Sequence, residues 1–202
     1  MLKGSKLSLC FLGCICVGIV VISFSLNQKR IENGLKQKTM ILGATTAEAP
    51  DQSEKIGRPL RIQIPKMDID TTIQSVGLTQ DGAMDVPSIT SDVGWFSFGP
   101  RPGEKGSAVI AGHLNGVDGS KGVFEELRSL EPGDSVFIED DMGKRHAFIV
   151  RKSHTYNAGD DVFEVFNQSE GIHLNLITCD GLWNIRTKSY TKSLVVFADS
   201  SE

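Results

Sequence analysis

The sequence predicts a mainly all-β domain, a closed or nearly closed β-barrel with one or two short helices, behind an N-terminal transmembrane helix. Three observations predict this fold. From residue 58 onward, short apolar runs recur with a period of two, turn-forming Gly, Pro and Asp residues separate them at close spacing, and few stretches show a helical period. The 202 residues, 40% of them hydrophobic, suit one such domain with an appendage.

The appendage precedes the barrel. Residues 1–6 form a short lysine-containing start, expected in the cytoplasm, and residues 7–26 contain no charge. Twenty residues at about 1.5 Å each span roughly 30 Å, the thickness of a bilayer's hydrocarbon core. We therefore expect a single membrane-spanning helix, in preference to a cleaved signal peptide or a lipoprotein signal at Cys14. Residues 27–57 lose the hydrophobic pattern, which predicts a flexible linker.

The domain itself is expected over residues 58–200. Residues 60–64 alternate strictly between apolar and polar and end at Pro65, which predicts the first strand. Further strands are expected at residues 69–76, 108–111, 135–138, 145–152, 173–178 and 194–197, with a hairpin turn at residues 140–143. Residues 124–130 carry apolar side chains at i, i+3 and i+6, which favours a short helix.

Composition limits the possible ligands. The formal net charge is -4 and the sequence pI is about 5.6, so there is no concentrated basic surface for nucleic acid. We expect no metal and no cofactor, since no His or Cys pair has metal-ligand spacing. The acidic pairs Asp140-Asp141 and Asp160-Asp161 are expected to be solvated turn residues, although such pairs also bind calcium. His146 and His154 are expected at the surface.

Two residues stand out as a candidate catalytic pair. Cys179 is the only cysteine beyond the first 16 positions, and it ends an apolar-alternating run directly before Asp180-Gly181. His113 ends a similar run that begins at Ser107. A thiolate is both a nucleophile and an acceptable leaving group, and an imidazole transfers protons near neutral pH. The pattern therefore favours a reactive thiol paired with an imidazole.

Several motifs in this order are similar to one known family. They are Val93-Gly94-Trp95-Phe96, the run from Pro102 to Ala111-Gly112-His113, Leu176-Ile177-Thr178-Cys179 and Leu194-Val195-Val196-Phe197-Ala198. On these motifs the chain resembles the sortases, the membrane-anchored cysteine transpeptidases of Gram-positive bacteria, and most of all the small class D to F sortases. The resemblance runs from Arg58 to Ala198 and implies a sortase-type barrel.

The resemblance also implies roles for individual residues. Cys179 would form a thioacyl intermediate, and His113 would protonate the departing amine and deprotonate the incoming one. The family's third catalytic group is an arginine on the last strand, at the position that Ser193 occupies here. Two replacements stay open: Arg186, which we favour because a guanidinium suits an oxyanion, or Ser193 together with backbone amides.

Three further residues are expected to contact the substrate because they lie close to Cys179 in the sequence. They are Asn175, which replaces a threonine of the family motif and shares the Cys179 face if the strand is regular, Thr178 and Trp183. His173 shares the Cys179 face if the strand is regular and is expected to line a groove. For Trp95, packing in the core is the simplest interpretation.

The implied function is cleavage of an LPXTG-like sorting signal in secreted proteins, followed by transfer of the acyl group to an amine of a cell-wall peptidoglycan precursor. The implied location is the cell membrane, with the catalytic domain on the extracellular side. Two alternatives remain: a membrane-tethered cysteine peptidase in which hydrolysis dominates, and a weakly active sortase-like binding module. The second alternative follows from Ser193 in the place of arginine.

Overall fold

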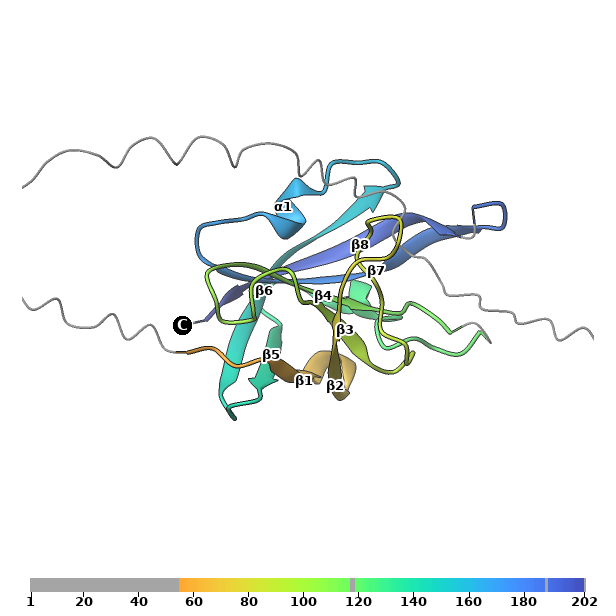
Figure 1. The fold of residues 1–202 in the computed structure, drawn as a ribbon. Coiled ribbons are helices and arrows are strands. Elements are labelled where there is room, and N and C mark those ends of the chain that lie inside the picture. Colours follow the sequence, from red (N-terminus) through yellow and green to blue (C-terminus); the bar gives the residue numbers. More distant parts are fainter. Residues whose placement is uncertain (1–54, 117–118, 188, 202) are drawn as a thin grey trace, which may run out of the picture. The chain divides into compact units, whose positions relative to one another are not determined.

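Eight strands close into a barrel in the computed structural model, which describes residues 55–116, 119–187 and 189–201 (Figure 1). Around the barrel the strands follow the order β1-β2-β3-β4-β7-β8-β6-β5. The strands are β1 Pro59–Ile64, β2 Ile69–Val76, β3 Val93–Phe96, β4 Gly106–Gly112, β5 Ser135–Asp140, β6 Arg145–Asn157, β7 Ile172–Asn184 and β8 Ser189–Ser200. The helices are η1 Pro65–Met67, η2 Leu127–Ser129 and α1 Phe163–Phe166. The predicted closed barrel is confirmed.

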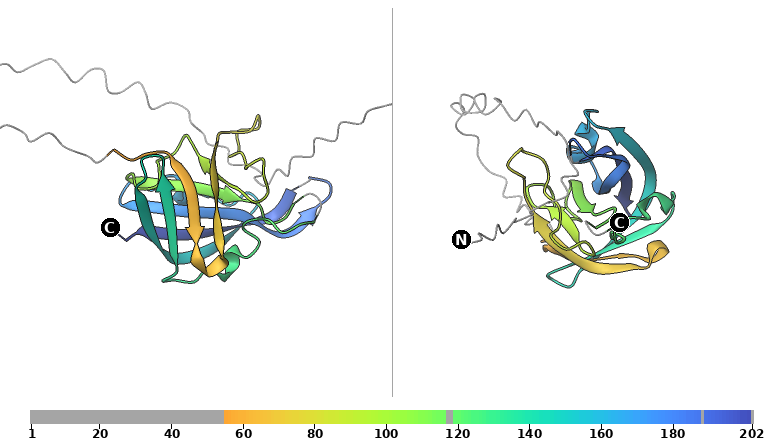
Figure 2. Two further views of the ribbon diagram at one scale, coloured as in Figure 1. Left: turned by 90° about the horizontal axis from the view of Figure 1, so that it is seen from below. Right: turned by 90° about the vertical axis from the view of Figure 1, so that its right-hand side faces the viewer.

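Most neighbouring strands are antiparallel, but the pairs β2–β3 and β4–β7 are parallel. Figure 2 shows the strands curving round to close the barrel. In the parallel pair β4–β7, Gly106 lies opposite Ile172 and Ala111 opposite Ile177. Parallel strands end on the same side, so the segments that follow β4 and β7 leave the barrel at one end.

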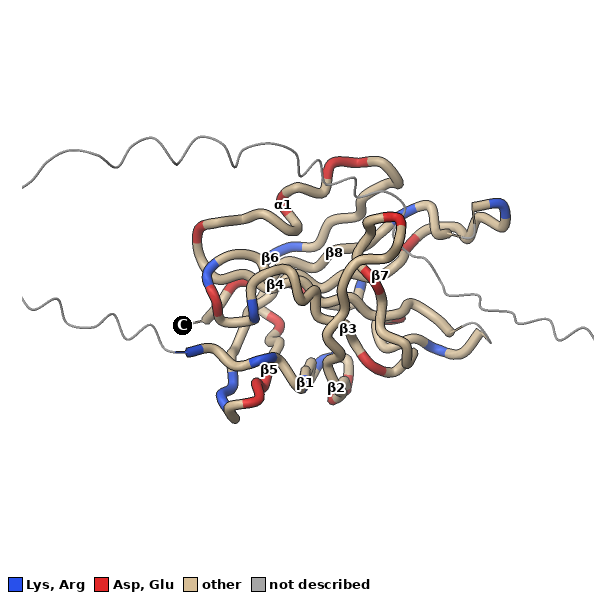
Figure 3. Tube along the Cα trace, in the orientation of Figure 1, with Lys and Arg blue, Asp and Glu red and all other residues tan. Residues whose placement is uncertain are grey.

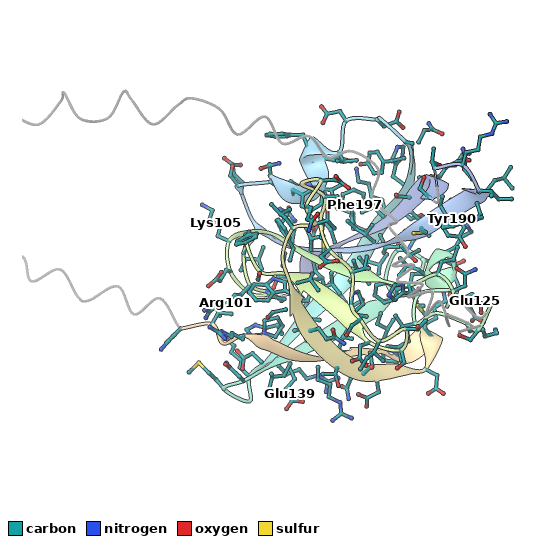
Figure 4. All side chains as sticks on the ribbon, turned by 45° about the vertical axis from the view of Figure 1, so that its right-hand side comes forward. Arg101, Lys105, Glu125, Glu139, Tyr190 and Phe197 are labelled. Carbon is teal, nitrogen blue, oxygen red and sulfur yellow. The ribbon has the colours of Figure 1, made fainter. Side chains whose placement is uncertain are left out.

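Two apolar clusters pack on the two faces of the sheet. The interior cluster draws residues from all eight strands, such as Leu174 and Leu194. The second cluster lies on the outer face under α1 and includes Val165 and Phe197. Both faces of β8 are thus buried, and each fully buried aliphatic or aromatic side chain stabilises the fold by about 1.5–3 kcal/mol. Figure 4 shows Phe197 below α1.

The predicted helix at residues 124–130 is a set of turns around the 3-10 helix η2. Phe124, Leu127 and Leu130 are all buried in the interior cluster. Their spacing of three matches the three residues per turn of a 3-10 helix rather than the 3.6 of an α-helix. Strand β3 and helix α1 were not expected as elements, because each has only four residues and no visible period.

Strands β7 and β8 are longer than predicted and continue as a hairpin beyond Cys179. Cys179 lies opposite Ser193, and a bulge follows before Trp183 pairs with Tyr190. In Figure 4 Tyr190 lies on this hairpin. The Tyr190 hydroxyl donates to Oδ1 of Asn115 at 2.7 Å, so the hairpin is tied to the segment that follows His113.

The expected membrane span at residues 7–26 and linker at residues 27–57 lie outside the described residues, except for the last three linker positions. In the part of the chain that the structure describes, no helix is both long and apolar enough to span a bilayer. Acidic and basic residues are interspersed around the barrel (Figure 3).

His146 is buried, which corrects the expectation of a surface histidine. Its side chain is 3% exposed, and Nε2 lies 3.2 Å from Oδ2 of Asp140, which is itself 2% exposed. Burial would raise the pKa of the Asp140 carboxyl, but hydrogen bonds from His146 and from the amides of Lys144, Gly57 and Met142 outweigh it and hold the pKa below its ordinary value. The buried carboxylate therefore fastens the start of β1 to the β5–β6 hairpin.

Replacement of Asp140 by asparagine is expected to lower the free energy of unfolding by about 1–3 kcal/mol, because an amide nitrogen would face backbone donors in a buried site. Since the folded pKa is depressed, the stabilisation is present above the unfolded pKa of about 3.9 and is lost as the pH falls through the folded value. Thermal unfolding at several pH values checks this. The difference in Tm between wild type and Asp140→Asn should shrink in acid, and a difference that stays constant would contradict this role.

Candidate active site

The parallel ends of β4 and β7 bring the two predicted catalytic residues to one place. The last recorded pair between the strands is Ala111 with Ile177. One position further on, the Thr178 hydroxyl donates to the Gly112 carbonyl oxygen at 2.9 Å. His113 directly follows Gly112 and Cys179 directly follows Thr178, so both residues lie at the same end of the barrel. The sequence-predicted pair is therefore brought together by backbone register.

Cys179 lies on the outer face of β7, near the end of the barrel. Its residue is 3% exposed, whereas Asp180 is half-buried and Gly181 is exposed. The chemistry considered below is that of the Cys179 thiol. A peptide must reach this sulfur from the side where the chain emerges after Asp180.

His113 is half-buried, and its backbone is enclosed by two glycines. A Cβ on Gly112 would lie 2.5 Å from the ring of Phe124, and a Cβ on Gly122 would lie 2.2 Å from the His113 carbonyl oxygen. The imidazole Nε2 lies 2.8 Å from the carbonyl oxygen of Pro87 in the β2–β3 connection. The two glycines thus permit a close approach that sets the position of His113.

Asp180 directly follows Cys179 in the sequence, and its negative charge is paired with the positive charge of Arg128. Burial would raise the pKa of Asp180, but a hydrogen bond from Arg128 and one from the Gly181 amide hold it below the ordinary value. Arg128, next to the buried Leu127 of η2, forms the ion pair with Asp180. This pair neutralises a negative charge that would otherwise disfavour a thiolate at Cys179.

Ser193 is the residue opposite Cys179 on β8, and Tyr156 of β6 is opposite Ser193. The three residues form one row across the outer face. The Tyr156 hydroxyl donates to Oε1 of Glu164 at 2.6 Å, and Lys152 also bonds this carboxylate. Chiefly the Tyr156 hydrogen bond holds the pKa of Glu164 below its ordinary value. Tyr156 and Glu164 carried no signal in the sequence, because only strand pairing places Tyr156 opposite Ser193, and Glu164 of α1 is joined to it by a hydrogen bond.

Arg186 is not brought to Cys179. It lies in the exposed turn that closes the β7–β8 hairpin, where its amide donates to Oδ1 of Asn184. Asn184 is five positions beyond Cys179 along β7, about 16 Å at 3.3 Å per residue. Trp183 lies on the same hairpin, 41% exposed, with its ring 5.2 Å from that of Tyr190.

Asn175 and Thr178, both expected to contact substrate, are buried. The Asn175 amide donates to the carbonyl oxygen of Val165 at 2.6 Å and so holds α1 against the barrel. The Thr178 hydroxyl is bonded to Gly112. Both side chains thus make buried hydrogen bonds within the domain.

The other histidines lie away from the pair. His173, six positions before Cys179 on β7, bonds Asp199 at 2.7 Å and the Glu170 carbonyl oxygen at 2.6 Å. His154 is exposed, as expected, and its ring packs edge-on against that of Tyr156. Trp95 is buried in the interior cluster.

No group of three or more His, Cys, Asp or Glu side chains is arranged to hold a metal ion within residues 55–116, 119–187 and 189–201. The carboxylates of the two acidic pairs are engaged with the backbone instead. Asp141 accepts from the Arg58 amide, Asp160 from the Asn157 amide and Asp161 from the Phe163 amide. Asp160 and Asp161 therefore stabilise their own turn, whereas Asp141 joins the β5–β6 hairpin to the start of β1.

Comparisons with known proteins agree with this fold. Residues 62–201 match the family described as the sortase domain, and a search of curated proteins found no match. Among solved structures, sortase C-1 from Actinomyces oris is similar with a TM-score of 0.56 and 18% identity, over 70% of this chain and 73% of that one. Sortase C from Clostridium perfringens SM101 has a TM-score of 0.53 and 22% identity, over 72% and 71%.

A sortase D5 transpeptidase from Clostridium perfringens is similar at a TM-score of 0.54 and 21% identity, over 72% of this chain and 79% of that one. Identities this low show a shared fold. The family match covers well over half of the chain, and on it the protein belongs to the sortase family. Sortases are cysteine transpeptidases, which join one polypeptide's new carboxyl end to an amine.

Proposed function

We propose that this chain is a sortase that cleaves an LPXTG-like sorting signal after its threonine and transfers the acyl group to a cell-wall amine. The observation that carries the proposal is the register of β4 and β7, with the Thr178–Gly112 hydrogen bond, which sets His113 beside Cys179 at one barrel end. Proximity of a thiol and an imidazole is the minimum that thioacyl transfer requires.

The reaction has two halves. The Cys179 thiolate attacks the carbonyl carbon of the scissile peptide bond, the C–N bond breaks, and the imidazolium of His113 gives its proton to the departing amine. In the second half an incoming amine attacks the thioester carbon, its proton passes to His113, and the C–S bond breaks to restore the thiolate. Each half is a general acid or base step of a kind worth about 10²–10⁴-fold in rate.

We assign the binding of the substrate carbonyl to Ser193 and not to Arg186. Ser193 is directly opposite Cys179, whereas Arg186 lies at the hairpin turn. Cβ atoms of directly opposed residues are about 4.5–5.5 Å apart, so a hydroxyl at Ser193 is close to a carbonyl under attack by Cys179. Ser193→Ala is expected to lower kcat about tenfold, against little change for Arg186→Ala, since one hydrogen-bond donor contributes about 1.5 kcal/mol.

We propose that the β7–β8 hairpin helps to hold the substrate. Leu182 is 77% exposed and Ile185 is 82% exposed, and Trp183 lies between them. Exposed apolar side chains next to a reactive residue are suited to an apolar side chain of a peptide. The partners we propose are secreted proteins with such a signal, and a peptidoglycan precursor as amine donor. The proposed location is the cell membrane, with residues 7–26 spanning it and the domain outside.

The test is incubation of the reduced full chain with an LPXTG-type peptide, with and without an amine acceptor, followed by mass analysis of products. Formation of the new amide supports the proposal. Hydrolysis alone in both conditions would favour the cysteine peptidase, and intact peptide in both would favour a binding module, for which the serine at position 193 is the motivating feature. Cys179→Ala is the matched control in every arm.

A further inference from the structure

The peptide group between Pro87 and Ser88 lies between His113 and β2. Its carbonyl oxygen is 2.8 Å from Nε2 of His113, and its N–H donates to Oε1 of Gln74 at 3.2 Å. None of the described peptide bonds is cis, so the C=O and N–H of this group point in opposite directions. A single peptide group therefore joins the His113 imidazole to the side chain of Gln74.

The Gln74 amide has one orientation. Its nitrogen donates to Oδ2 of Asp92 at 2.8 Å. A carboxylate only accepts, so the amide oxygen must face the other way, toward Ser88. That oxygen accepts from both the N–H and the hydroxyl of Ser88, each at 3.2 Å. The Thr71 hydroxyl, which donates to the Ser91 carbonyl oxygen, adds a further hydrogen bond to the same connection.

Packing against β3 also fixes the position of Pro87. It is buried, and its ring lies against β3 at Gly94, the residue opposite Gln74 in the parallel pairing. A Cβ on Gly94 would lie 3.2 Å from Cδ of Pro87 and 2.8 Å from Val76. The missing side chain at Gly94 thus makes room for the proline ring. Packing and hydrogen bonding together fix the carbonyl that faces His113.

We propose that Gln74 is a positioning residue that keeps neutral His113 in the tautomer with its hydrogen on Nε2. The Pro87 carbonyl oxygen can only accept, so Nε2 must donate, and Nδ1 is then the nitrogen that exchanges protons. The consequence for catalysis rests on the proposed function, in which Nδ1 serves Cys179 and the substrate amine. The tautomer itself does not depend on that function.

The experiment uses the reduced full chain with 15N-labelled histidine and long-range proton–nitrogen NMR at about pH 8.5, above the ordinary imidazole pKa. His113→Gln identifies the His113 signals. The wild type should show predominantly the Nε2–H tautomer. In Gln74→Ala both tautomers should appear, and kcat should fall about tenfold with little change in KM, less than the roughly 10²–10⁴-fold for complete loss of proton transfer.

A further variant sharpens the test. Thr79→Ala removes a hydroxyl contact of the same β2–β3 connection, to the Ala83 amide, and should leave both the tautomer and kcat unchanged. An Nδ1–H tautomer in the wild type would overturn the proposal, whether or not Gln74→Ala folds. So would a folded Gln74→Ala chain with the wild-type tautomer and kcat.

The outcomes also separate this inference from the proposed function. An Nε2–H tautomer that depends on Gln74, in a chain without peptide transfer, would support the positioning role and refute the sortase reaction. Peptide transfer by a chain whose neutral His113 carries its hydrogen on Nδ1 would do the reverse.

Discussion

Replacement of Cys179 by alanine is expected to abolish peptide cleavage and amine transfer, with kcat/KM falling by about 10⁴-fold or more, to the assay background. The reaction needs a nucleophile that becomes a leaving group, and Cys179 supplies the only thiol in the described residues. The change removes a single sulfur atom at a buried position, so the free energy of unfolding should change by about 1 kcal/mol.

The assay is product formation from an LPXTG-type peptide under reducing conditions, with thermal unfolding as the control for folding. A folded Cys179→Ala chain that retains a tenth or more of wild-type turnover would refute the role of this residue. Loss of activity together with loss of folding would leave Cys179→Ser as the deciding variant, because its side chain is nearly the same size.

Replacement of His113 by glutamine is expected to lower kcat/KM by about 10²–10⁴-fold. Glutamine has an amide nitrogen that can donate to the Pro87 carbonyl oxygen, as Nε2 of His113 does, but it takes no proton from a thiol or an amine. The variant should therefore fold while proton transfer is lost. His113→Ala removes the hydrogen bond as well and should lose stability in addition.

The measurement is kcat/KM as a function of pH, together with the rate of Cys179 alkylation by a small reagent. Wild-type activity should follow the protonation of an imidazole, and that limb of the profile should disappear in His113→Gln. An unchanged pH profile with near-normal activity would show that another group transfers the proton. His154→Gln, at an exposed histidine on the same face, is the matched control.

Strand periodicity made most of the barrel predictable. Apolar alternation identified β1 and the centre of β7, because successive side chains of a strand point to opposite faces. Short apolar runs identified β2 and the centres of β4 and β8. The hairpin extension of β7 and β8 was missed because residues 181–187 are exposed, and their polar and apolar side chains do not alternate. The 3-10 form of η2 was missed because i, i+3 and i+6 fit both helix types over two turns.

The site was predictable in part, for a similar reason. Cys179 and His113 stand at strand ends, so parallel pairing alone could bring them together. Arg186 was favoured on chemical grounds, but the length of the hairpin separates it from Cys179. Asn175 was expected to bind substrate because alternate residues of a strand share one face of the sheet, which places it on the face of Cys179. The alternation does not reveal what covers that face, and α1 covers it at Asn175. Pro87 acts through its backbone carbonyl, which has no signature in a sequence.

The expected surface position of His146 was wrong because its burial depends on a contact that the sequence does not reveal. His146 follows the turn at residues 140–143, a position that is usually solvated, but its carboxylate partner Asp140 is buried with it. A buried, hydrogen-bonded Asp–His pair is stable where either residue alone would be costly. The sequence contains both residues but not their contact.

We expect the buried sulfur of Cys179 to carry the acyl group between the two substrates. The most direct measurement is the intact mass of the reduced full chain after brief incubation with an LPXTG-type peptide and an acid quench, followed by digestion to locate the modified residue. We expect one added acyl fragment that ends at the threonine, attached to Cys179 and released by an amine. An acyl fragment on any other residue, or none on a folded and reduced chain, would contradict it.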